Sequence, residues 1–197
     1  MEKGYTIKGD TIIINRELTT LDLFVKEFID VLKKYSDYLV VSGFVSISSG
    51  RTRGTEDVDI LFPITDKKIF SNLFFALKEI GFWCYQGEDA ETVYSYIENF
   101  SSIRFARKDE IFPNIEFIPI NEERKAKYFE FTHPQKIRIE GFDFKIPPIE
   151  FEILYKEIIL AGQKDKADAL HLRVFFADII NEKKFKEYEP IIRGELK

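Results

Sequence analysis

Apolar and polar residues follow two different spacings along this chain. In some segments apolar residues recur every three or four positions, which is the spacing of one face of an α-helix. In others they alternate with polar residues or form short continuous runs, which is typical of β-strands. We therefore expect helices at residues 20–32, 67–80, 88–99, 150–161 and 164–180. We expect strands at residues 5–7, 11–14, 38–41, 58–62, 102–107, 115–118 and, around a turn at Gly141, 137–146.

The order of these elements predicts an α/β (α+β) fold with a mixed β-sheet, helices on one face of it and a helical C-terminal part. Residues 1–36 are expected to form a peripheral hairpin and a helix packed on the core. Residues 37–146 would form that core and residues 147–197 the helical part. Because no linker-like stretch separates these ranges, we expect one compact unit overall.

Composition narrows the class of protein. The 197 residues are 45% apolar and 32% charged, as in a globular domain rather than a disordered chain. The net charge of -5 disfavours a general nucleic-acid coat and leaves a local basic groove open. The single cysteine excludes an internal disulfide and a thiolate zinc cluster. With neither a long apolar run nor a basic leader in the sequence, we expect a cytoplasmic protein without a membrane partner.

The stretch 40–62 carries the candidate chemistry. Successive side chains of a strand point to opposite faces, so Asp57 and Asp59 are expected on one face. Two neighbouring carboxylates repel each other, and a divalent cation that binds both relieves the repulsion. An acid–apolar–acid pattern by itself is weak evidence, because an exposed pair at a strand end has the same sequence.

A turn with phosphate-binding features precedes the two acids. Gly43 allows close approach of the backbone to a ligand, with Ser42 beside it. Arg51 and Arg53 carry donors suited to phosphate oxygens. The alternative is that both arginines are surface residues of a polar turn. A phosphate-binding turn followed by a metal-binding strand is the layout of a nucleoside triphosphate site.

These residues resemble the DNA polymerase beta-type nucleotidyltransferase superfamily, in particular its small prokaryotic members. The family pattern is a Gly followed by Gly or Ser at a strand end, about ten to fifteen further residues, and an acid–apolar–acid strand. Gly43, Asp57 and Asp59 match it, whereas Phe44 stands where the family has a small residue. Ser42 and Ser46 are the nearest hydroxyls that could substitute.

The C-terminal part extends the resemblance to about residues 38–180. Gly141, residues 146–150, Lys156 and Asp168 follow the order found in a subset of these small nucleotidyltransferases. The family also has a third acidic ligand on a later strand, for which Glu116 is the candidate in place of the usual Asp. The alternatives are an edge-strand glutamate in water for Glu116 and a snorkelling side chain for Lys156.

The resemblance implies an Mg²⁺-dependent transferase with three acidic residues, Asp57, Asp59 and Glu116, holding two magnesium ions. Nucleotide-binding roles would belong to Ser42, Gly43, Arg51, Arg53 and Lys156. The enzyme would move a nucleoside monophosphate from an NTP, ATP foremost, to a hydroxyl acceptor.

The resemblance leaves the acceptor open among small molecules, proteins and RNA. Toxin–antitoxin and defence systems contain such enzymes, so an antitoxin-type protein partner is included among the expected partners. The alternative function is a catalytically weak or inactive nucleotide- or partner-binding module that retains the fold. Phe44 and Glu116, which depart from the family pattern, support that alternative.

Overall fold

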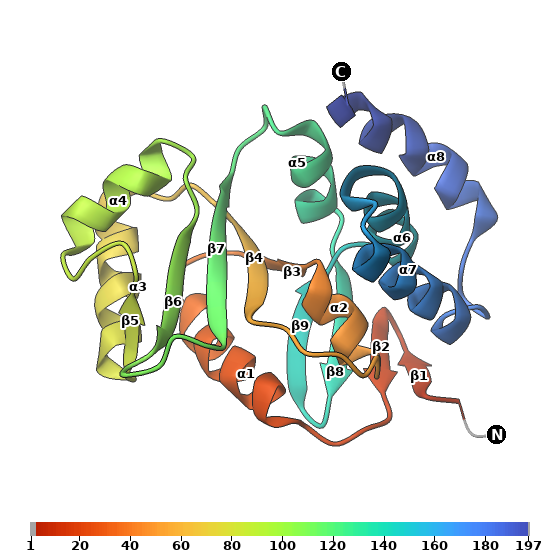
Figure 1. Ribbon diagram of the computed structural model, residues 1–197, viewed down its shortest axis with the longest axis horizontal. Coiled ribbons are helices and arrows are strands. Elements are labelled where there is room, and N and C mark those ends of the chain that lie inside the picture. The colour runs from red at the N-terminus through yellow and green to blue at the C-terminus, as the bar shows by residue number, and fades with distance from the viewer. Residues whose placement is uncertain (1–2, 197) are drawn as a thin grey trace. The chain divides into compact units, whose positions relative to one another are not determined.

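The computed structural model describes residues 3–196, which divide into two compact units. The first unit comprises residues 3–17, 40–53 and 122–196, and the second comprises residues 18–39 and 54–121. Both units contain strands and helices, so the chain has the mixed α/β class expected from its sequence (Figure 1). Within the described residues, no helix is both long enough and apolar enough to cross a membrane.

The second unit is built on a mixed β-sheet with the strand order β3-β4-β7-β6-β5, of which β3 contributes Leu39 to this unit. Strand β4 runs parallel to β7, and β6 runs antiparallel to both β7 and β5. The strands are β3 (Leu39–Val41), β4 (Asp57–Pro63), β5 (Phe82–Cys84), β6 (Ile103–Arg107) and β7 (Asn114–Ile120). The helices are α1 (Thr20–Leu32), α3 (Lys67–Glu79) and α4 (Ala90–Glu98).

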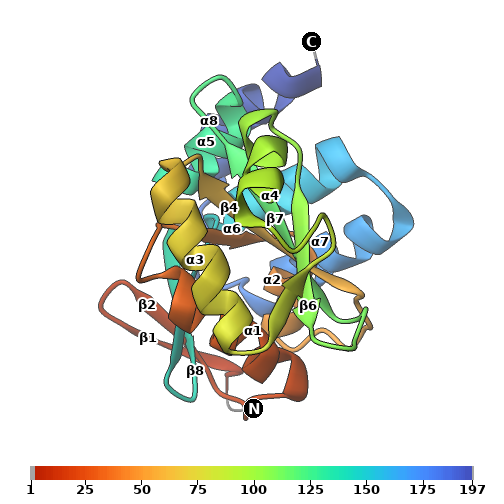
Figure 2. The same cartoon turned by 90° about the vertical axis from the view of Figure 1, so that its left-hand side faces the viewer.

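Aromatic side chains fix which face of this sheet the helices cover. Phe28 of α1 lies 5.5 Å from Phe105 and 5.9 Å from Phe117, measured between ring centroids. Phe74 of α3 lies 6.1 Å from Phe105. Helices α3 and α4 lie beside each other, in contact with β5 and β6 respectively (Figure 2). Side chains alternate along a strand, so the residues that come directly before and after Phe105 in β6 and Phe117 in β7 point to the opposite face of the sheet.

The first unit contains a second sheet, with the strand order β1-β2-β8-β9. Its strands are β1 (Tyr5–Lys8), β2 (Thr11–Ile14), β8 (Gln135–Ile139) and β9 (Phe142–Ile146). The N-terminal hairpin, β1 and β2, forms one end of this sheet. Strand β2 pairs along its length with β8 in parallel, and Ile12 and Ile14 are buried. Alternation in the sequence predicts a strand but not its partner, which here lies more than a hundred residues away.

Helices complete the first unit, and α6, α7 and α8 lie together in Figure 1. They are α2 (Gly43–Ser48), α5 (Lys125–Thr132), α6 (Ile149–Tyr155) with a π-helical turn at Lys156–Leu160, α7 (Gln163–Phe175), α8 (Glu182–Arg193) and a 3₁₀ turn at Gly194–Leu196. Helix α5 was not predicted because it buries only Ala126 and Glu130 and so lacks an apolar stripe. Helix α8 has an apolar stripe, since Phe185, Tyr188 and Ile192 are buried at helical spacing.

Candidate functional site

Three carboxylates converge on the sheet face of the second unit that lies opposite its helices. The parallel register places Asp59 directly beside Glu116, and Asp57 lies two residues earlier on the same strand. Neighbouring strands are about 4.8 Å apart, so side chains paired in register on one face come close together. One carboxylate oxygen from each of the three residues lies within 4.8 Å of the others, and all three residues are half-buried.

Two side chains hold Glu116 in place: Arg104 of β6 and Ser102, which directly precedes β6. Its Oε2 accepts hydrogen bonds from Arg104 Nη2 (2.7 Å) and Nε (3.3 Å), and its Oε1 accepts one from Ser102 Oγ (2.8 Å). The hydrogen bond to Glu116 raises the pKa of Arg104 above its ordinary value, and the charge of Asp57 adds to the effect. Arg104 thus offsets part of the negative charge of the cluster and fixes the orientation of its third acid.

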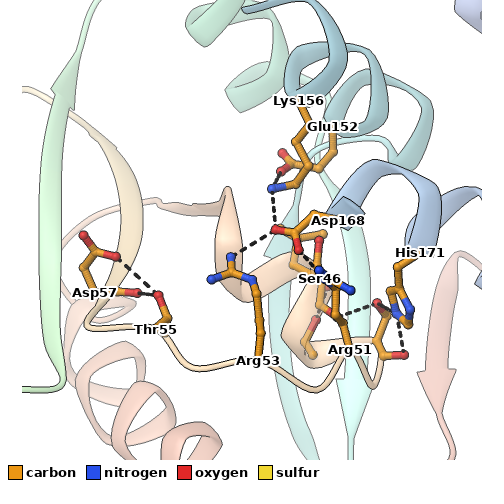
Figure 3. A network of polar contacts seen from close by, with 12 residues as sticks. Ser46, Arg51, Arg53, Thr55, Asp57, Glu152, Lys156, Asp168 and His171 are labelled. Atoms are coloured by element: carbon orange, nitrogen blue, oxygen red, sulfur yellow. Dashed lines mark hydrogen bonds and ion pairs between the residues drawn. The ribbon is translucent and has the colours of Figure 1, made fainter. Parts of the chain in front are cut away.

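The donor set fits a divalent cation such as magnesium. Magnesium prefers carboxylate oxygens and retains several waters, which suits a half-buried cluster. Asp57 accepts a long hydrogen bond from Thr55 Oγ1 (3.4 Å), and Thr55 Oγ1 also donates to the Asp57 carbonyl (2.9 Å; Figure 3). The loop before β4 therefore steadies the first acid, as Arg104 and Ser102 steady the third.

In the first unit, the turn after β3 has an unusual backbone. Ser42 has φ of 62°, a left-handed value that few residues other than glycine adopt. It precedes Gly43, the first residue of α2, where an added Cβ would lie 2.3 Å from Nη2 of Arg53. The close approach that glycine permits here is therefore made by the Arg53 guanidinium. Phe44 is fully buried and lies 5.7 Å from Phe144 of β9, so the core of the first unit uses this large side chain.

Asp168 of α7 brings the two arginines together (Figure 3). Its carboxylate accepts hydrogen bonds from Arg51 Nε (2.5 Å), Arg53 Nη2 (3.0 Å) and Lys156 Nζ (3.3 Å). Lys156 also forms an ion pair with Glu152 at 3.3 Å. The Lys156 side chain is 0% exposed. Its ammonium is therefore paired internally with Asp168 and Glu152.

Sequence reasoning missed Ser102 and Arg104, whose role depends on the pairing of β6 with β7. Asp168 was named in the C-terminal pattern, but its ion pairs with Arg51 and Arg53 were not predicted. Its position indicated burial, since it lies four residues before the buried Leu172 and thus on the buried stripe of α7. An acid on the buried face of a helix requires cationic partners.

Several solved structures match this chain, and two of them are similar to it over most of its length. The chain is similar to an antigenic nucleotidyltransferase-like protein from Paracoccidioides brasiliensis, with a TM-score of 0.53 and 16% identity over 92% of this chain and 89% of that one. It is also similar to ANT(2")-Ia, crystallised with adenylyl-2"-tobramycin, with a TM-score of 0.53 and 13% identity over 91% of this chain and 100% of that one.

No protein-family model and no curated protein sequence matches the chain. At this level of identity the structural similarity establishes the fold. It agrees with the resemblance drawn from Gly43, Asp57 and Asp59. The chain therefore has the fold of the nucleotidyltransferase superfamily.

Proposed function

We propose that this protein transfers a nucleoside monophosphate from an NTP to a hydroxyl acceptor. The observation that carries the proposal is the convergence of the Asp57, Asp59 and Glu116 oxygens within 4.8 Å, in a chain with a nucleotidyltransferase fold. ATP is the donor we propose, and the adenylyl product named for ANT(2")-Ia supports it. The acceptor belongs to one of three classes: small molecules, proteins or RNA.

In the proposed reaction the acceptor oxygen attacks the α-phosphorus, and the bond from that phosphorus to the oxygen bridging to the β-phosphate breaks. Pyrophosphate leaves, and the hydroxyl proton passes to solvent. The three acids would hold two magnesium ions, which would neutralise phosphate charge and favour ionisation of the acceptor hydroxyl. Ser102 and Arg104 orient Glu116 for this task, and Thr55 orients Asp57.

The first unit offers separate groups for phosphate oxygens. Arg51 and Arg53 have side chains that are 26% and 11% exposed, so part of each side chain reaches solvent. Guanidinium donors match phosphate geometry, and they bind without a change of protonation. We assign nucleotide-binding roles to these two arginines and to the backbone of Ser42 and Gly43.

Incubation with α-³²P-labelled NTPs, using cell extract as the source of acceptor, tests the proposal. Wild-type protein should label an acceptor and release pyrophosphate, and Asp57→Asn should lower the rate by about a hundredfold or more. Asp143→Asn is the matched control, because Asp143 is an exposed strand aspartate paired with Arg138. Loss of the labelled product on treatment with RNase or with protease assigns the acceptor class. Full activity of Asp57→Asn would refute the assignment of the site.

A second candidate function is a nucleotide-binding module with weak or no catalysis. It is favoured by one observation: both Glu116 oxygens already accept hydrogen bonds, from Ser102 and Arg104. Magnesium-dependent ATP binding without pyrophosphate release would support this candidate, and label transfer would exclude it. Growth arrest on expression that requires Asp57 would support a toxin role, and rescue by a co-expressed neighbouring gene would support an antitoxin-type partner.

A further inference from the structure

Asp168 is a fully buried carboxylate surrounded by three cations from two different segments. Its side chain is 0% exposed, as is that of Lys156. Arg51 and Arg53 approach it from the turn after α2, and Lys156 approaches it from the π-helical turn after α6 (Figure 3). With Glu152 beside Lys156, the cluster has three positive and two negative side chains, so a positive charge remains.

The exposure of these side chains separates an inner layer from an outer layer. Asp168 and Lys156 form the inner layer, because neither has exposed surface. Arg51 and Arg53 form the outer layer, because their side chains contact Asp168 and are also partly exposed. Arg51 uses only its single Nε–H donor for Asp168, so the N–H groups of its terminal nitrogens can serve another acceptor.

Gly43 shows where the Arg53 guanidinium is held. A Cβ on Gly43 would lie 2.3 Å from Nη2 of Arg53, which is a clash, and 3.2 Å from Cζ, which is a tight contact. A side chain at position 43 and the observed position of Arg53 therefore exclude each other. The same nitrogen, Nη2, donates a hydrogen bond to Asp168 at 3.0 Å. The group is thus fixed between Asp168 and the Ser42–Gly43 turn.

We propose that Asp168 is a positioning residue that places the guanidinium groups of Arg51 and Arg53 at the Ser42–Gly43 turn to receive the triphosphate of the nucleotide. Asp168 does not contact the nucleotide, because its carboxylate is buried and would repel phosphate. A pre-oriented arginine loses less side-chain entropy on binding, which lowers the KM for the NTP. This inference rests on the proposed function and assigns the phosphate-binding part of it.

The first test measures ATP affinity and transfer kinetics in the full chain. Asp168→Asn keeps the shape and removes the charge, and it should raise the KM for ATP about tenfold or more with a smaller change in kcat. Mn²⁺ affinity, measured by electron paramagnetic resonance, should stay unchanged. In a double-mutant cycle, adding Arg53→Gln to Asp168→Asn should cause little further loss. Additive losses, or wild-type ATP affinity in Asp168→Asn, would overturn the positioning role.

A second variant keeps the test decisive if Asp168→Asn does not fold. Gly43→Ala leaves Asp168 intact and displaces Arg53, so it should also weaken ATP binding several-fold. Gly54→Ala is the matched control, because a Cβ at Gly54 meets no atom within 4 Å. Equal affinities in the two alanine variants would overturn the inference. Failure of wild-type protein to bind any of ATP, GTP, CTP or UTP would instead overturn the proposed function, and this inference with it.

Discussion

The ion pair between Arg104 and Glu116 lowers the net negative charge of the acidic cluster. Removing this ion pair should therefore change the affinity of the cluster for a divalent cation. Arg104 Nη2 lies 2.7 Å from Glu116 Oε2, and the ligand oxygens of the cluster lie within 4.8 Å of one another. A guanidinium roughly 8 Å from a divalent ion opposes its binding by about 1 kcal/mol in water, and by more at a shorter distance or where water is excluded. Arg104→Gln should therefore tighten Mn²⁺ binding by about fivefold or more.

Isothermal titration with Mn²⁺ measures this affinity without any substrate. Arg107→Gln is the matched control, because Arg107 lies on the same strand and loses the same charge. Its guanidinium stacks 4.6 Å from the Phe82 ring centroid and pairs with Glu27, on the helix-covered face. Binding in Arg104→Gln that is unchanged or weaker, or an equal gain in Arg107→Gln, would show that this ion pair does not limit metal affinity.

Further predictions concern stability. Phe44→Ala should lower the free energy of unfolding by about 3–5 kcal/mol in urea titrations, since it removes a fully buried ring; a loss below about 1 kcal/mol would contradict its core role. Ile12→Asp should prevent folding of the first unit, seen as lost circular dichroism, whereas the exposed Ile7→Asp should be tolerated. Burial raises the pKa of Glu130 to about 7, with nearby Glu152 adding to it and Lys127 opposing it. The unfolded chain releases this proton near the ordinary value of 4.5, so stability should fall as pH rises from about 4.5 to 7, by at most about 3 kcal/mol. Glu130→Gln should remove that slope; an unchanged slope would exclude Glu130 as its source.

The sequence by itself determined the class of the fold and the faces of its main elements. Alternation put Asp57 and Asp59 on one side of a strand, and helical spacing predicted α1, α3, α6 and α7. Both properties are local, because they follow from the geometry of a single element. The glycine turn and the two acids were sufficient to indicate the nucleotidyltransferase fold.

Only the tertiary structure decided which distant residues meet. The register between β4 and β7 pairs Asp59 with Glu116, and the pairing of β7 with β6 adds Arg104. Likewise, the packing of α6 against α7 pairs the buried Lys156 with Asp168. Strand partners and burial depend on contacts between segments far apart in the chain, and the pattern of residues within one segment does not contain them.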